Sequence, residues 1–321
     1  MSFLEVVNLK TYFFTRRGVV KAADGVSFGV ERGETFGLVG ESGCGKSITC
    51  LSIMRLVPEP GGRIVEGVIR LEGEDLVRKS SKEMIKIRGS KISMILQDPM
   101  TSLNPVFTIG NQLIEAIKVH RGGKGKELWE RARSILQRVH IPSPEECLKS
   151  WPHQLSGGMR QRVVGAISIS CEPRLLIADE PTTSLDATIQ LQYLRLLREL
   201  QEKTGLALIF VTHDFGIVAR MCQRAAVMYA GKIVEMAEVR ELFDHPTHPY
   251  TQALMKSVPK VEEKIERLTS IEGQPPSLHQ LPSGCAFAPR CSCKEDGCRP
   301  DEYPPMVEVK RGHFLSCWRF R

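Results

Sequence analysis

The chain has 321 residues, of which 42% are hydrophobic and 25% are charged, and its formal net charge is +7. This length allows one large domain with an appendage or two domains, and the composition is ordinary for a globular protein. Acidic and basic residues are interleaved, and no apolar stretch approaches the roughly 20 residues that span a bilayer. We therefore expect no nucleic-acid-binding tail, no membrane span, no signal peptide and a cytoplasmic location.

The N-terminal part alternates apolar and polar positions, which predicts antiparallel strands over the first 35 or so residues. A short apolar run, residues 34–39, predicts a buried strand that ends in a glycine-rich turn. Residues 46–57 then predict a helix, because Pro58 and Pro60 follow them. Residues 108–141 carry helical periodicity and predict a mostly helical insert.

The second half repeats a strand–helix–strand pattern. Residues 175–178 and 206–211 are all apolar, as strands buried in a parallel sheet are, and residues 188–203 between them predict an amphipathic helix. Residues 273–321 are rich in Pro, Gly and Cys with little periodicity. Because such a tail builds little core of its own, we expect it to dock on the body, to be held by a metal, or both.

Residues 40–47 read GESGCGKS and fit the phosphate-loop pattern G-x-x-x-x-G-K-[ST] between a predicted strand and a predicted helix. The glycines allow backbone N–H groups to point at phosphate oxygens, and the helix N-terminus adds its dipole. This pattern predicts ATP and Mg²⁺ as ligands, with the Lys46 ammonium on the β- and γ-phosphates and the Ser47 hydroxyl on the metal. The predicted nucleotide-binding residues here are Gly40, Glu41, Ser42, Gly43, Cys44, Gly45, Lys46, Ser47 and Ile48.

A second apolar strand ends in two carboxylates, Asp179 and Glu180. One carboxylate at such a position can hold the Mg²⁺ shell and the other can activate a water. We assign Asp179 to the metal and Glu180 to the general base. Taken alone, the two carboxylates could equally mark a solvated strand end. The presence of a phosphate loop favours the catalytic interpretation over that alternative.

The chain resembles the ABC ATPases in the segment LSGGMRQR, residues 155–162, which resembles their signature motif. In that family Ser156 and the glycines, Gly158 included, would contact the γ-phosphate held by the opposite subunit. Three switch elements follow the family order: the Q-loop glutamine, the D-loop and the switch histidine. By this resemblance they are Gln97, which would sense Mg²⁺ and the attacking water, residues 184–186 (SLD) and His213.

The same resemblance implies an aromatic side chain stacked on adenine, for which Phe13 is our choice and Tyr12 the runner-up. It also implies the fold, an α/β P-loop ATPase domain with a RecA-like core, an antiparallel β subdomain and a helical insert, plus a small Cys-rich C-terminal extension. We place the ATPase domain at residues 1–245, its helical subdomain at about 100–170, and the C-terminal region at residues 246–321.

Further segments resemble the oligopeptide/dipeptide permease ATPases: residues 97–105 (QDPMTSLNP), residues 245–251 (HPTHPYT) and the cysteine-bearing tail. This resemblance implies a peripheral subunit at the cytoplasmic face of the membrane that energises peptide uptake. The implied partners are two transmembrane permease subunits, a second ABC ATPase subunit bound head to tail and, indirectly, an extracellular substrate-binding protein. Nickel and glutathione importers share much of the pattern, so they remain the alternative cargoes.

Five of the ten cysteines lie in the last 37 residues. In a reducing compartment such a cluster indicates ligation before disulfides, but its spacing fits no zinc ribbon and no ferredoxin run. The peptide-permease resemblance implies a [4Fe–4S] cluster, with Cys293 as a substitute for Cys291; free thiols that pack the tail are the alternative. The implied ligands are Cys285, Cys291, Cys298 and Cys317.

Two other functions deserve comparison with a transport ATPase. A soluble cassette protein acting on nucleic acid or ribosomes would need a long coiled coil or a second cassette, and the sequence has neither. An iron–sulfur regulator with ATP as a mere ligand would not need Glu180 and His213. An exporter with a fused membrane domain is also disfavoured. We therefore expect an active importer ATPase without nucleic-acid partners.

Overall fold

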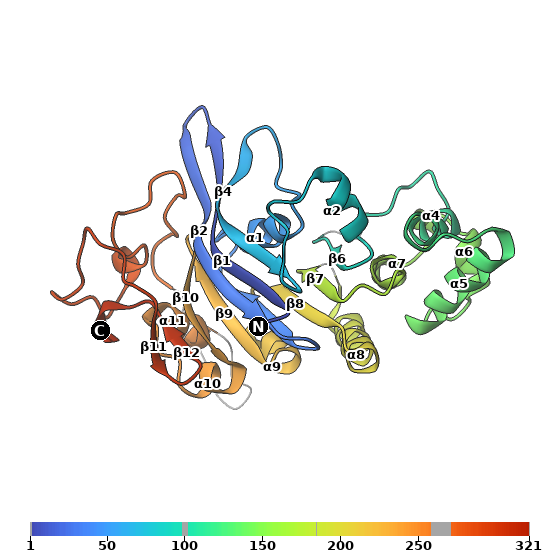
Figure 1. Ribbon diagram of the computed structural model, residues 1–321. Coiled ribbons are helices and arrows are strands. Elements are labelled where there is room, and N and C mark those ends of the chain that lie inside the picture. Colours follow the sequence, from blue (N-terminus) through green and yellow to red (C-terminus); the bar gives the residue numbers. More distant parts are fainter. Residues whose placement is uncertain (1, 98–101, 184, 258–270, 321) are drawn as a thin grey trace. The chain divides into compact units, whose positions relative to one another are not determined.

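The computed structural model describes residues 2–97, 102–183, 185–257 and 271–320 (Figure 1). Its contacts divide the chain into two units, each described here by itself. Unit 1 comprises Met1–Val30, Thr35–Val77 and Thr212–Arg321, and unit 2 comprises Glu31–Glu34 and Arg78–Val211. Among the described residues, no helix is both long enough and apolar enough to cross a membrane.

The predicted N-terminal strands form an antiparallel sheet of unit 1, in the order β2-β1-β4-β5. Leu4 of β1 lies opposite Val30 of β2 on one side and Leu71 of β4 on the other. Alternate residues of β1 are buried near its start, as a strand with one covered face requires. The bounds are β1 (Leu4–Thr15), β2 (Gly18–Val30), β4 (Gly62–Leu71) and β5 (Glu74–Asp75).

A second set of unit 1 strands has the order β11-β12-β10-β9-β3. The β3–β9 pair is parallel and the other neighbours are antiparallel. All five residues of β3 are buried, as expected for the strand before the phosphate loop. The bounds are β3 (Thr35–Val39), β9 (Arg224–Tyr229), β10 (Lys232–Glu238), β11 (Val307–Lys310) and β12 (His313–Leu315).

The helices of unit 1 are short. Helix α1 begins at Lys46 as predicted, but it ends at Ile53, before the predicted end at residue 57. Arg55 adopts a left-handed φ of 50°, and the N–H of Leu56 donates to the carbonyl of Leu51 at 2.8 Å, which is a Schellman ending. The bounds are α1 (Lys46–Ile53), α9 (Phe215–Met221), α10 (Val239–Asp244) and α11 (Pro249–Ser257).

The cysteine-bearing tail is part of unit 1 and packs against the rest of it, as the expectation of docking on the body predicts. Ala286 and Phe287 are buried in a core cluster that also contains Tyr229 and Tyr250. Strand β12 pairs with β10 and β11 pairs with β12, so the tail extends the main sheet (Figure 1). The described part of the tail is therefore not set apart as an extension with its own core.

Unit 2 holds three parallel strands in the order β8-β7-β6, surrounded by helices. The predicted strands at 175–178 and 206–211 correspond to β7 and β8, and the predicted helix at 188–203 corresponds to α8. The periodicity over 108–141 corresponds to α4 and α5. The bounds are β6 (Ile92–Ile95), β7 (Leu175–Asp179), β8 (Ala207–Thr212), α2 (Ser81–Ile87), α4 (Ile109–Arg121), α5 (Gly125–Arg138), α6 (Pro144–Lys149), α7 (Gly157–Ile169) and α8 (Ala187–Thr204).

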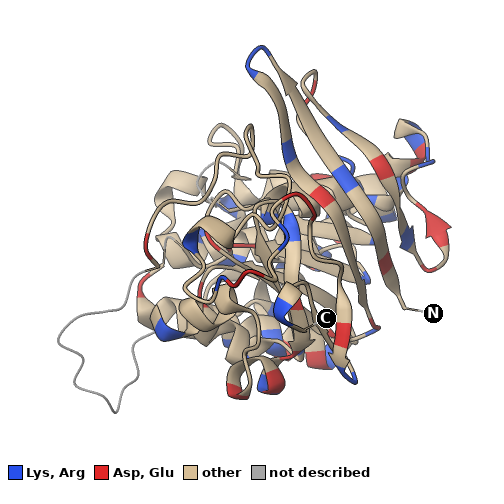
Figure 2. Ribbon diagram, turned by 90° about the vertical axis from the view of Figure 1, so that its left-hand side faces the viewer, with Lys and Arg blue, Asp and Glu red and all other residues tan. Residues whose placement is uncertain are grey.

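Basic and acidic residues are interspersed along the ribbon, as the sequence predicts (Figure 2).

Candidate nucleotide site

The predicted phosphate loop joins β3 to α1 in unit 1, and two of its positions have no room for a side chain. A Cβ added to Gly40 would lie 2.2 Å from the carbonyl oxygen of Met228. A Cβ added to Gly45, whose φ is 107°, would lie 1.9 Å from the carbonyl oxygen of Ala22. Glycine is thus required at both positions, because the loop passes directly against neighbouring backbone.

Lys46 lies inside this loop, and its side chain is nearly fully buried. Its Nζ donates to the carbonyl oxygens of Gly40 at 2.8 Å and Glu41 at 2.9 Å. The ammonium is therefore held against the loop, where a phosphate bound by the loop would meet it. Ser47 follows in the first turn of α1, and that turn carries no acidic residue to oppose an anion.

Two residues outside the predicted set contact the loop at Glu41. The Glu41 N–H donates to the Tyr250 hydroxyl at 3.0 Å, and the Arg290 guanidinium donates to both oxygens of the Glu41 carboxylate. Sequence reasoning missed this role, because 209 and 249 positions separate Glu41 from these side chains. The only signal was the resemblance of residues 245–251 to a family segment.

The acidic strand end of unit 2 brings two predicted residues together. Asp179 is the buried last residue of β7. Glu180 follows with a φ of 44°, and its N–H donates to the carbonyl of Val211 at 3.0 Å. A non-glycine residue in this region is strained, which is a common feature of functional sites. Gln97 Nε2 donates to Glu180 Oε2 at 3.0 Å, so Gln97 and Glu180 form one polar pair.

Thr183, which the sequence analysis did not single out, also donates to Glu180 Oε2, from Oγ1 at 3.1 Å. These two donors fix the orientation of the Glu180 carboxylate. An oriented carboxylate at the end of a buried strand can accept a proton from a water that lies beside it.

The predicted signature segment begins α7 in unit 2. Ser156 is the N-cap of α7, and its hydroxyl accepts a hydrogen bond from the Met159 N–H at 3.3 Å. A Cβ on Gly158 would lie 2.7 Å from Ile189 Cγ2, whereas Gly157 has open space around it. Gly158 therefore allows α7 to approach the start of α8.

The remaining switch elements are only partly described. Ser184 of the predicted D-loop and residues 98–101 of the extended Q-loop segment lie outside the described residues. Asp186 caps α8, accepting hydrogen bonds from Thr188 and Ile189. His213 is exposed, in the short connection between β8 and α9. His213 and the phosphate loop belong to unit 1, whereas Gln97 and Glu180 belong to unit 2.

The two candidates for stacking on adenine, Tyr12 and Phe13, are consecutive residues of β1. The Tyr12 hydroxyl donates to Asp24 Oδ1 at 2.5 Å, and burial raises the Tyr12 pKa. Phe13 is half-buried, close to Gly62 of β4. Phe14, which the sequence analysis did not consider, is 41% exposed with the Arg63 guanidinium 4.1 Å from its ring centroid.

The tail cysteines converge but do not form a metal site. All five line one cavity of about 20 Å³. Burial raises the pKa values of the Cys285, Cys291 and Cys317 thiols, which favours neutral thiols over thiolate ligands. Among the described residues, no three or more Cys, His, Asp or Glu side chains are grouped so as to hold a metal ion. The arrangement therefore does not fit the [4Fe–4S] cluster that the resemblance implied.

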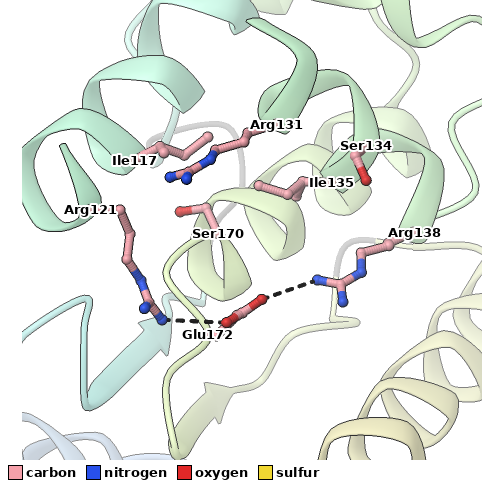
Figure 3. Close-up of a pocket in the computed structure, with 8 residues that line it drawn as sticks. All are labelled: Ile117, Arg121, Arg131, Ser134, Ile135, Arg138, Ser170 and Glu172. Carbon is pink, nitrogen blue, oxygen red and sulfur yellow. Dashed lines mark hydrogen bonds and ion pairs between the residues drawn. The ribbon is translucent and has the colours of Figure 1, made fainter. Parts of the chain in front are cut away.

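A larger cavity of about 570 Å³ lies in the helical part of unit 2 (Figure 3). Arg121 from α4 and Arg138 from α5 both point toward Glu172, at 3.4 and 3.8 Å. Arg131 also lines the cavity, and it pairs with Glu127 at 2.9 Å. Three guanidinium groups against the single carboxylate of the lining give this cavity a positive character.

Comparison with known proteins places this geometry in a family. Residues 23–183 match the ABC transporter family, and residues 234–298 match the C-terminal region of oligopeptide/dipeptide transporters. The chain is 49% identical to the oligopeptide transport ATP-binding protein AppD of Bacillus subtilis (strain 168), over 99% of this chain and 97% of AppD. It is 47% identical to the dipeptide transport ATP-binding protein DppD of Escherichia coli (strain K12), over 99% of this chain and 96% of that protein.

Solved structures agree with these relatives. The dimeric ATP-binding cassette MJ0796, in a post-hydrolysis state bound to ADP and Pi, matches with a TM-score of 0.66 at 26% identity, over 74% of this chain and 99% of that chain. The cbiO1 protein of Clostridium perfringens, part of the ABC transporter complex cbiONQ, matches with a TM-score of 0.65 at 27% identity, over 76% of this chain and 92% of that chain. The chain therefore belongs to the ABC transporter ATPases, as an ATP-binding subunit of the oligopeptide/dipeptide permease family.

Proposed function

We propose that this chain hydrolyses ATP to energise the uptake of di- and oligopeptides through a membrane importer. The observation that carries the proposal is near-full-length similarity to peptide-transport ATP-binding proteins in a chain that retains a phosphate loop and a Gln97–Glu180 pair. Relatives named for peptide transport support peptides as the cargo over nickel or glutathione.

In this proposal the chain's own residues perform distinct parts of the reaction. The phosphate loop binds the ATP phosphates through its N–H groups and Lys46. Glu180 accepts the proton of the attacking water, Gln97 holds Glu180 in place, and His213 contacts the γ-phosphate. The roles of these residues and of Phe13 at adenine rest on the family resemblance.

Magnesium suits the oxygen donors that the family pattern assigns to it. Ser47 offers a hydroxyl, Gln97 an amide oxygen and Asp179 a buried carboxylate, and hard cations such as Mg²⁺ prefer oxygen ligands. When bound, Mg²⁺ neutralises charge on the phosphate oxygens.

We further propose that two such ATPase subunits close head to tail. Ser156 caps α7 at a helix N-terminus, which is a site where backbone N–H groups bind anions. In the closed pair this terminus meets the γ-phosphate held by the other subunit. ATP thereby favours the closed state and hydrolysis releases it, so the pair is a two-state device biased by its ligand.

The other partners in this proposal are two transmembrane permease subunits, at the cytoplasmic face of the membrane, and indirectly an extracellular binding protein. We place their docking surface on the helical subdomain, about residues 100–170. We keep residues 1–245 as the ATPase domain and residues 246–321 as the C-terminal region.

Uptake measurements test the proposed function. The full transporter would be assembled in vesicles, with labelled dipeptide, Ni²⁺ and glutathione offered in parallel. ATP-dependent accumulation of the dipeptide alone is the expected result. Accumulation of Ni²⁺ or glutathione without dipeptide would overturn the cargo, and ATP hydrolysis without any permease partner in membrane pull-downs would overturn the transport role.

A further inference from the structure

The strongest feature outside the proposed machinery is the connection between the phosphate loop and the C-terminal region. Arg290 and Glu41 form a bidentate pair, with Nη1–Oε2 at 2.8 Å and Nη2–Oε1 at 3.1 Å. The Arg290 side chain is only 5% exposed and that of Glu41 is 26% exposed. A fork-to-fork pair that is largely removed from water is stronger and more directional than a surface ion pair.

Arg290 is itself fixed by further hydrogen bonds, one within the C-terminal region and one to β9. Its Nε donates to the carbonyl oxygen of Glu272 at 3.0 Å, and its Nη1 donates to the Tyr229 hydroxyl at 3.3 Å. The hydrogen bonds to Glu41 are the largest cause of a raised Arg290 pKa. The guanidinium is thus an anchored cation, and the loop carboxylate is the group that it orients.

A second contact reaches the same loop residue through its backbone. The Glu41 N–H donates to the hydroxyl of Tyr250, a fully buried residue at the start of α11. The Tyr250 ring centroid lies 4.5 Å from that of Tyr229 and 5.3 Å from that of Phe287. Burial raises the Tyr250 pKa, so the hydroxyl is neutral. Because Phe287 lies in the tail, this aromatic packing joins the tail to Tyr250.

Glu41 is therefore held at both its backbone and its side chain by residues that lie beyond position 245. Lys46, in turn, donates to the carbonyl of Glu41. A shift of the loop at Glu41 would carry the Lys46 ammonium with it. Geometric errors of about 1 Å in such a cradle weaken ligand binding strongly.

We infer that Arg290 and Tyr250 are positioning residues for the phosphate loop, so that the packing of the C-terminal region sets the affinity of this subunit for ATP. The inference rests on the ATP-binding role of the proposed function. The inference gives the C-terminal region a role in nucleotide binding, which is to hold Glu41 in place. Neither residue touches the reacting atoms, and both act through the loop.

The test measures binding of the non-hydrolysable analogue AMP-PNP with Mg²⁺ to the full chain by calorimetry. Arg290→Gln and Glu41→Gln should each weaken binding roughly 10-fold, the scale of one lost charge-assisted interaction. Because the two side chains act as a pair, the double variant should bind no more weakly than either single variant. Arg299→Gln is the matched control, since Arg299 is an exposed tail arginine paired with Glu302.

Tyr250→Phe provides an independent arm, because it removes one oxygen and keeps the buried ring. In the assembled transporter it should raise the KM for ATP several-fold and leave kcat at saturating ATP within about 2-fold. If the single variants fold and bind AMP-PNP like the parent, or if their effects simply add, the inference is overturned. Tyr250→Phe decides the matter alone should Arg290→Gln not fold. Failure of the parent to bind the analogue would instead overturn the ATP-binding role itself.

Discussion

Glu235 is a fully buried carboxylate of β10, and it organises the segment before α11. It accepts hydrogen bonds from the N–H groups of Thr247 at 2.8 Å and His248 at 3.0 Å. His313 Nε2 of β12 lies 2.7 Å from the same carboxylate. One side chain thus fastens both the loop that precedes α11 and strand β12.

Glu235→Ala should therefore destabilise unit 1 strongly. It leaves the N–H groups of Thr247 and His248 without their acceptor, at about 1–3 kcal/mol each, and it removes the hydrogen-bond partner of the buried His313 ring. These costs overlap, so we expect a total loss of about 4 kcal/mol and a melting temperature lower by roughly 10 °C. Thermal unfolding of the full chain followed by circular dichroism measures this change.

Glu238→Ala is the matched control, because Glu238 is an exposed carboxylate of the same strand, and it should change stability by less than about 0.5 kcal/mol. Glu235→Ala should also raise the KM for ATP, because His248 Nδ1 accepts a hydrogen bond from the Tyr250 N–H at 3.0 Å. A melting temperature within about 2 °C of the parent would refute the assignment of Glu235 as the anchor of this segment.

Three further predictions concern the site and its support. Glu180→Gln should lower ATP hydrolysis at least about 100-fold and keep ATP binding; full hydrolysis by this variant would exclude Glu180 as the base. Gly45→Ala should abolish AMP-PNP binding, because the new Cβ would meet the Ala22 carbonyl at 1.9 Å; parental affinity in calorimetry would contradict this. Burial lowers the pKa of His248 to about 4. The stability that the neutral His248 ring contributes to the folded state is therefore complete above the unfolded pKa of about 6.5 and is lost as the pH falls toward 4. In denaturant titrations the free energy of unfolding should fall by about 1.4 kcal/mol per pH unit in that window, and His248→Asn should not show this fall. Equal pH profiles for the parent and His248→Asn would contradict this prediction.

Periodicity and local motifs made much of the fold predictable. The phosphate loop, the acidic strand end and the strand–helix–strand repeat were visible because each depends on neighbouring residues. The end of α1 was not predictable. The prolines at 58 and 60 predict a helix that ends at residue 57, whereas the left-handed conformation of Arg55 stops the helix earlier. Nothing in a single sequence marks a residue such as Arg55 for that conformation.

Contacts between distant segments were the second limit. Glu41 was predictable as a loop residue, but its contacts with Arg290 and Tyr250 were not, since pairing across more than 200 positions leaves no local pattern. The cysteine tail shows the converse. Its thiols do converge on one cavity, yet the spacing alone could not distinguish a packed group of thiols from a ligand set.

The pairing of β12 with β10 also protects the chain from aggregation with other copies. Without the last 15 or so residues, β10 would present unpaired N–H and C=O groups, which recruit strands from other chains. The hairpin replaces that edge with β11, a four-residue strand that carries Glu308 and Lys310. Short, charged edges resist such recruitment. The C-terminal hairpin thus acts as a protective cap, and shortened versions of this chain should aggregate even where their nucleotide site is intact.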